Sequence, residues 1–332
     1  MSTSLERRRR FAVEALNRWQ DHTSTCRQQD VACSATSIAE TPPMLQRSDS
    51  LDHSTALSLD NIRQSLIRQE DTIIFSLIER AQFAANEPVY QSGAIAVPGY
   101  AADGRQYSLL EYLLWETEQM HGRIRRYTSP DEHAFFPRDL PPLVLPPIQY
   151  SEVLAPYARE ININDKVMAL YLDHLIPGIT EPGTDNNYGS SAMYDVLALQ
   201  ALSKRIHYGK FVAEAKFLAN TEDYSSLIRQ QDADGLMRLL TDEAVEAKVV
   251  ERVRRKAATY GQDITSSSSA PGLDNGDLAD SARPAGGERG CDSAKLHYKV
   301  EPEIVAELYR TWVMPLNKEV QIQYLLRRLE AP

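Results

Sequence analysis

The chain has 332 residues, of which 42% are hydrophobic and 25% are charged, and its formal net charge is -10. Nucleic acids and anionic membranes need a basic surface, so this acidic balance argues against both as main partners. No apolar run approaches the roughly 18 to 20 residues of a membrane span. The three cysteines form no CxxC pair and no cluster with histidine, which disfavours a disulfide framework and a zinc site. A reducing compartment fits this composition best.

The first 57 residues differ from the rest of the chain and are expected to form a disordered extension. They contain the run Arg7–Arg10 and a later enrichment in serine and threonine, which is typical of an organellar transit peptide. They also contain more acidic residues than such peptides usually carry. We therefore expect a cytoplasmic protein, with the plastid stroma as the alternative.

Residues 58–332 are expected to form a helical domain. Ser58 is a candidate N-cap of the first helix, whose apolar residues recur at helical spacing: Leu59, Ile62, Leu66, Ile73, Leu77 and Ala81. A second helix is predicted near 107–127, and a proline-rich extended connector follows it. Further helices are predicted at 164–175, 190–219, 222–229, 232–240, 241–260 and 302–329, the last kinked or broken at Pro315. Residues 261–296 have the low complexity of a disordered loop. No alternating strand pattern is present, so the predicted fold class is all-α.

The usual catalytic motifs are missing, which leaves polar residues on the amphipathic helices as candidates. There is no GxSxG, no Walker loop, no GxGxxG after a strand and no HExxH. Two cations in "SKRIHYGKFVAEAK", Arg205 and Lys216, are eleven residues apart, a spacing that returns to nearly the same helix face. Gly209 lies between them on that stripe, and His207 is expected to be a packed side chain.

Other candidates lie four residues apart on a predicted helix or at the edge of an apolar stripe: Asp242 with Glu246, Asn317 with Gln321, and Arg63. Thr241 is the expected cap of the helix that carries the two acids. Taken singly, each has an ordinary explanation, such as a cation at a helix flank or an acid near a helix N-terminus. Taken together they predict a pocket of three cations, two acids and two amides. Such a pocket suits a small dianion that bears a hydroxyl.

At this point the sequence resembles the all-helical eukaryotic chorismate mutases of plants, algae and fungi. The matching stretches run from about residue 58 to 330: "LDNIRQSLIRQEDTIIFSLIERAQF", "RIRRYTSPDEHAFFP", "ININDK", "NNYGSSA", "LSKRIHYGKFVAEAKF" and "PLNKEVQIQYLLRRLE". The resemblance implies a large multi-helix bundle that acts as a homodimer. It also implies conversion of chorismate to prephenate in phenylalanine and tyrosine biosynthesis. That reaction is a pericyclic shift that uses no cofactor and no metal.

The resemblance also implies roles for the candidate residues. Arg63 and Arg205 would bind the carboxylates, for which the forked guanidinium is well suited. Lys216 would donate to the ether oxygen with help from Gln321. Glu246 would bind the ring hydroxyl, with Asp242 beside it and Asn317 as a further substrate contact. Gly209 is expected to leave room for the ligand between the two cations, with a close helix crossing as the ordinary alternative.

Three of these positions depart from the fungal pattern, which has Glu at Gln321, Thr at Asn317 and Asn at Asp242. The changes are conservative, and we expect activity to survive them.

The resemblance extends to an effector site for tyrosine or tryptophan at a subunit interface. The residues that match it are Arg125, Arg126, Asn186, Asn187, Gly189 and Ser190. The alternative is simple turn and cap chemistry, because "DNNYGSS" is a good turn and helix start in any protein. Met193 and Glu301 replace threonines of the fungal pattern, so the sign of regulation stays open.

Two other functions remain as alternatives to the mutase. One is a catalytically silent helical dimer that binds aromatic amino acids or regulates a true mutase. The other is a related pyruvate lyase that acts on isochorismate. Retention of Arg63, Arg205, Lys216 and Glu246 disfavours the silent protein. The match to the large eukaryotic mutases disfavours the lyase.

Overall fold

The computed structural model describes residues 59–97, 106–148, 150, 152–262 and 298–330. Within these ranges the chain is helical, and its one extended pairing is an isolated bridge between Gln262 and Tyr298. The all-α prediction is therefore confirmed. No helix of the described part is long and apolar enough to cross a membrane. Ser58, the predicted extension 1–57 and nearly all of the predicted loop 261–296 lie outside the described residues.

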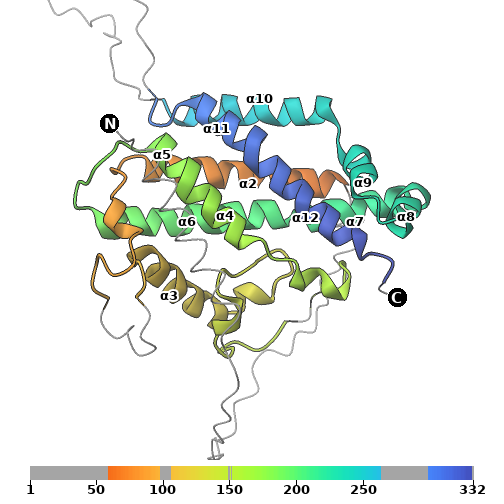
Figure 1. Cartoon of the computed structure of the whole chain (residues 1–332), viewed down its shortest axis with the longest axis horizontal. Coiled ribbons are helices and arrows are strands. Elements are labelled where there is room, and N and C mark those ends of the chain that lie inside the picture. The colour runs from red at the N-terminus through yellow and green to blue at the C-terminus, as the bar shows by residue number, and fades with distance from the viewer. Residues whose placement is uncertain (1–58, 98–105, 149, 151, 263–297, 331–332) are drawn as a thin grey trace, which may run out of the picture.

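Three helices form the central layer of the molecule. Helix α2 (Leu59–Arg80) packs along α6 (Tyr188–His207), and α7 (Gly209–Ala219) continues in the direction of α6 (Figure 1). The predicted stripe of α2 faces this packing, since Ile62, Ile73 and Leu77 are buried. The single helix predicted over 190–219 is interrupted at Tyr208, so Arg205 and Lys216 belong to different helices.

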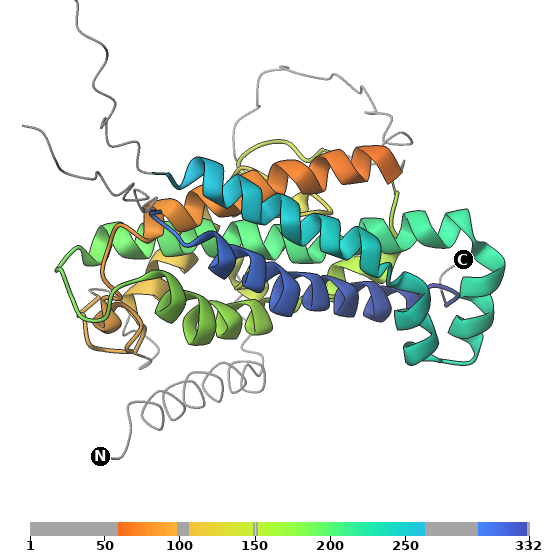
Figure 2. The same ribbon diagram turned by 90° about the horizontal axis from the view of Figure 1, so that it is seen from above.

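A second layer brings the C-terminal segment across the first. Helix α10 (Glu243–Tyr260) packs on α2, and α11 (Pro302–Leu308) packs on α10. Helix α12 (Met314–Leu326) then crosses α6 and α7, as Figures 1 and 2 both show. The end of α10 lies next to the segment that leads into α11, because the Lys299 N–H donates to the Gly261 carbonyl. Distant parts of the sequence therefore meet along α12.

Two wide helical turns stand where proline enters a helix. Residues Tyr171–Leu175 (η6) join α4 (Asn164–Leu170) to α5 (Ile176–Ile179), and residues Tyr309–Val313 (η7) join α11 to α12. A proline, Pro177 or Pro315, follows each turn at the second position of the next helix. Its ring would collide with the carbonyl four residues earlier, and a π-turn relieves that collision. The predicted break at Pro315 is thus a widened turn just before it.

The remaining elements cover one face and one end of the central layer. Helix α3 (Leu109–Arg123) starts with a capping box between Ser108 and Glu111. It ends before the predicted residue 127, because Arg125 has a left-handed backbone with φ 75°. The other elements are η2 (Glu87–Val89), η3 (Arg126–Thr128), η4 (Pro137–Asp139), η5 (Pro156–Glu160), α8 (Thr221–Arg229) and α9 (Ala233–Leu240).

Candidate active site

Arg205 is a buried cation that forms no ion pair with a carboxylate of the described residues. Its residue is 5% exposed, and its Nε and Nη1 atoms have no hydrogen-bond partner. Burial lowers the pKa of the guanidinium, and the hydroxyl-bearing ring of Tyr309, 5.9 Å away, partly offsets this shift. Buried N–H groups are costly when they have no acceptor. An anion that accepts from them would remove that cost.

Glu70 is buried nearby but is already committed to other cations. Arg252 of α10 binds it through two bonds of 2.6 and 2.9 Å, and Lys256 lies 3.2 Å from it. The charge of Glu70 raises the pKa of Arg205 against the larger effect of burial, but the oxygens of Glu70 are bound to Arg252 and Lys256 rather than to Arg205. Sequence analysis missed Glu70, although the signal was present: an acid at position 70 interrupts the apolar stripe of α2 between Leu66 and Ile73.

The amides of α12 join Arg205 to the rest of the candidate site. Asn317 donates through Nδ2 to the backbone carbonyls of Arg205 and Ile206, at 3.2 and 2.9 Å. Its Oδ1 atom accepts from Nε2 of Gln321 at 2.8 Å. The other amide atom of Gln321, Oε1, is buried without a partner. The predicted pair at 317 and 321 thus forms one hydrogen-bonded unit beside Arg205.

The sequence analysis expected Gly209 to make room for a ligand, but the backbone of α12 lies against it. A Cβ atom at this position would lie 2.6 Å from the backbone carbonyl oxygen of Asn317. The glycine instead allows α7 and α12 to cross closely. Its role is to hold Asn317 and Gln321 against α7, and the expectation of ligand space was wrong.

Lys216 lies among charged groups at the other end of this crossing. Its Nζ atom donates to the Leu240 carbonyl at 2.7 Å. Burial lowers the pKa of its ammonium, while the charges of Asp242 and Glu246 raise it and that of Lys318 lowers it. Lys318 itself binds Glu246 at 2.9 and 3.3 Å. Sequence analysis missed Lys318, because a lysine beside Asn317 carries no distinguishing pattern.

Asp242 both caps α10 and contributes to this charge cluster. Its Oδ1 atom accepts from the Val245 N–H at 3.1 Å, so Asp242 is the N-cap. The prediction that Thr241 caps the helix was wrong by one residue. Because the cap fixes the first turn of α10, it also fixes where Glu246 points.

Arg63 is the one predicted site residue that stands apart in this conformation. Its side chain is 64% exposed, and its guanidinium binds Asp60 at 3.1 Å on the same helix. The preceding residue, Ile62, packs with Tyr208, Phe211 and Ala215 next to Lys216. Arg63 therefore lies at the edge of the site without contacting the other candidates.

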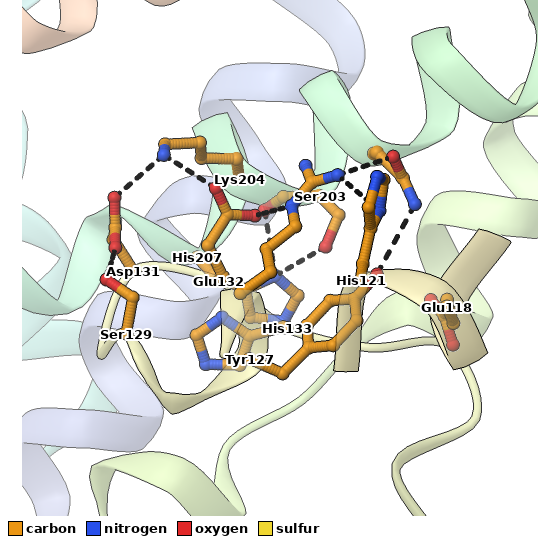
Figure 3. A network of polar contacts seen from close by, with 12 residues as sticks. Glu118, His121, Tyr127, Ser129, Asp131, Glu132, His133, Ser203, Lys204 and His207 are labelled. Atoms are coloured by element: carbon orange, nitrogen blue, oxygen red, sulfur yellow. Dashed lines mark hydrogen bonds and ion pairs between the residues drawn. The ribbon is translucent and has the colours of Figure 1, made fainter. Parts of the chain in front are cut away.

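The predicted effector residues fall into two groups on one chain. Arg126 donates to Glu132, His121 and Gln200, at 3.1, 2.9 and 2.8 Å. Lys204 of α6 binds Asp131 and Glu132 on the same segment (Figure 3). Arg125 donates to the Pro146 carbonyl.

The second group begins α6 at some distance from the first. Asn186 has a left-handed backbone, and the Asn187 N–H donates to Asp185. Gly189 and Ser190 are exposed in the first turn of the helix. Ser190 and Gln200, the α6 contact of Arg126, are ten residues apart, or about 15 Å along the axis. One chain therefore does not bring the two groups together.

His207 is packed, as predicted. It is fully buried, its Nε2 atom accepts from the Ile163 N–H, and its ring stacks on His133 at 4.2 Å (Figure 3). Burial lowers the pKa of this imidazole to about 3, so it is neutral. Across the described residues no group of histidine, cysteine and acidic side chains could hold a metal ion.

Fold and site together define an all-helical protein with a candidate anion site around a buried arginine. The surrounding helices supply two lysines, two acids and two amides.

Comparison with known proteins gives the family. Residues 187–322 match the model described as "Chorismate mutase type II", a span that includes every predicted catalytic residue except Arg63. "Chorismate mutase 1, chloroplastic" of Petunia hybrida is 48% identical over 297 residues, covering 90% of this chain and 82% of the relative. The chain therefore belongs to the chorismate mutase family.

Solved structures agree with this assignment. The Aro7p chorismate mutase of Candida albicans in complex with L-Trp has a TM-score of 0.74 and 40% identity, covering 86% of this chain and 96% of its own. Structures of AtCM1 with tyrosine and with phenylalanine in the allosteric site each have a TM-score of 0.69 and 45% identity, covering 84% of this chain and 99% of their own.

Proposed function

We propose that this chain catalyses the rearrangement of chorismate to prephenate through the site around Arg205. The observation that carries the assignment to this site is the buried guanidinium with two N–H groups that lack acceptors. Chorismate is a dianion with an ether bridge and a ring hydroxyl. One of its carboxylates supplies the acceptor that the protein does not.

The chemistry asks the protein for positioning and charge rather than for a reactive group. In the substrate the ether C–O bond breaks while a new C–C bond forms within the same molecule, so no atom is gained or lost. Catalysis therefore comes from holding the compact conformer and stabilising charge as the C–O bond breaks. A cluster of fixed cations and amides serves both needs.

Arg205 binds one carboxylate, and Arg63 binds the other after releasing Asp60. Lys216 and Gln321 donate to the ether oxygen. In the free protein Lys216 donates to the Leu240 carbonyl, and Gln321 donates to Asn317 Oδ1. When the substrate binds, its ether oxygen replaces these acceptors.

The acids and the remaining amide have supporting parts. Glu246 accepts from the ring hydroxyl and faces the positive character that develops on the ring, with Asp242 beside it. Lys318 pairs with Glu246 in the free protein and holds that carboxylate at the edge of the site. Asn317 acts by holding Gln321 and the backbone at Arg205, because both ends of its amide are already used.

A second copy of the chain would complete the effector site. A groove of about 950 Å³ runs between α2 and α6, and Phe75, Tyr194, Leu197 and Arg126 are among the residues that line it. Phe75 and Leu197 are about half exposed. A partner packed on this face would bury them and bring its Asn186–Ser190 turn towards Arg125 and Arg126. The related structures that hold L-Trp, tyrosine or phenylalanine support such an effector site.

For the compartment, the matched relatives favour the plastid stroma over the cytoplasm. The Petunia relative named chloroplastic aligns with 90% of this chain, whereas Petunia "Chorismate mutase 2", which is not so named, aligns with 84% at 44% identity. Fusing residues 1–58 to a fluorescent protein tests this. Diffuse cytosolic fluorescence would contradict plastid targeting.

The function is tested by incubating the purified chain with chorismate and identifying the product by NMR. Prephenate without pyruvate is expected. Release of pyruvate would instead identify a lyase. Binding of aromatic amino acids without any turnover would identify a silent regulatory protein.

Replacing Lys216 by alanine should lower kcat by at least about 10²-fold, the usual effect of removing one preorganised donor. Steady-state kinetics with chorismate measure the change. Lys166→Ala is the control, because Lys166 is an exposed lysine paired with Glu319. Turnover near that of the wild type in Lys216→Ala would remove Lys216 from the site.

Replacing Gln321 by glutamate should make catalysis depend on pH. The amide can donate at any ordinary pH, so the natural protein should show a nearly flat kcat/KM around neutrality. Glutamate donates only when protonated, and its reference pKa is about 4.3, so Gln321→Glu should be most active in acid and decline as pH rises. If the pH profiles of the two proteins coincide, Gln321 does not touch the ether oxygen.

Tyrosine or tryptophan should shift the chorismate saturation curve if the two effector groups meet in a dimer. Arg126→Ala should abolish the shift, because it removes the guanidinium that lines the groove. Arg310→Ala, a change at an exposed ion pair with Glu307, should keep it. Titration of each amino acid at sub-saturating chorismate, with light scattering for the oligomeric state, measures both. A monomer that still responds would contradict the shared site.

A further inference from the structure

Glu214 is a buried carboxylate on α7, two residues before Lys216. Its side chain is 5% exposed, and its carboxylate binds residues of α12 and of the turn after it. Arg328 binds it through Nε and Nη2 at 2.7 and 3.0 Å, and the Tyr324 hydroxyl donates to it at 2.6 Å. The carboxylate therefore ties α7 to the C-terminal end of α12.

Tyr324 is held from several directions. It is fully buried, and its hydroxyl oxygen accepts from the Ala155 N–H at 3.0 Å while donating to Glu214. Its carbonyl accepts from the Tyr157 hydroxyl at 2.8 Å. Burial and the neighbouring Glu214 carboxylate raise the pKa of Tyr324, so the phenol keeps its proton and stays a donor. The Arg328 guanidinium lies 4.8 Å from the Phe217 ring centroid, next to Lys216.

These contacts join α7 to α12 at a second place along their length. The first is the close crossing at Gly209 and Asn317. Gln321 lies between Asn317 and Tyr324 on α12, and Lys216 lies about 3 Å along α7 from Glu214. A displacement of only about 1 Å at a catalytic group can cost 10²-fold in rate.

We propose that Glu214, with Tyr324 and Arg328, positions Lys216 and Gln321 so that both donate to the same substrate atom. Glu214 itself touches no substrate. It fixes the separation and register of the two helices that carry the donors, and a charged, bidentate contact does so more rigidly than apolar packing. This inference rests on the proposed site.

The test uses two variants that keep side-chain size, Tyr324→Phe and Glu214→Gln. Each should lower kcat about 5- to 20-fold while the KM for chorismate changes less than about twofold, because the carboxylate-binding arginines are untouched. Lys166→Gln breaks an exposed α12 ion pair and is the matched control, with unchanged kcat. Wild-type kcat in Tyr324→Phe would overturn the proposal even if Glu214→Gln did not fold.

A second measurement separates positioning from general loss of structure. In a Lys216→Ala background, Tyr324→Phe should lower the residual turnover by a clearly smaller factor than in the natural protein, because one of the two donors that it positions is gone. The same fold-reduction in both backgrounds would overturn the proposal. Near wild-type turnover in Lys216→Ala would instead show that the proposed site is wrong. That result is distinct from a failure of the positioning role proposed for Glu214.

Discussion

The burial of Arg205 without a counterion is the constraint on which the site depends. Removing a guanidinium from water is costly unless a partner compensates, and elsewhere in this protein a partner is present. Arg80, equally buried, lies 2.6 Å from Asp195 and also donates to the Phe83 and Ala85 carbonyls. The charge of Glu70 favours the protonated form of Arg205, but the oxygens of Glu70 are bound to Arg252 and Lys256. Arg205 is therefore left with two buried N–H groups that lack acceptors, and an anionic ligand would supply these acceptors.

Holding that cation in place requires the long-range contacts of α12. Asn317 binds the carbonyls at Arg205 and Ile206, and Gly209 lets the two helices approach closely enough for those bonds to form. The π-turn before Pro315 lets α12 continue from α11 in the direction of this crossing. The stability of the scaffold and the geometry of the site therefore depend on the same contacts.

Much of this could be predicted from residues whose signal is local. The apolar stripe of α2, the pairs at 242/246 and 317/321, and the all-helical class follow from spacing alone, and the family motifs indicated the residues of the site. Features that depend on packing could not be predicted. For Gly209 the sequence left ligand space and a close helix crossing as alternatives, because it does not reveal which backbone lies against the glycine. Glu214 was overlooked because its partners, Tyr324 and Arg328, are more than a hundred residues away.

The most direct measurement is the thermal stability of Arg205→Met with and without a bicyclic ether dicarboxylate that mimics the compact, cyclic transition state. A ligand at about 100 times its Kd adds about 2.7 kcal/mol to the stability of the protein that binds it. The wild type should gain this stabilisation. Arg205→Met should be at least as stable as the wild type without ligand, because it no longer buries an uncompensated charge, and should gain little from the ligand. A variant that is strongly destabilised yet still stabilised by the dicarboxylate would show that Arg205 serves the fold rather than the substrate.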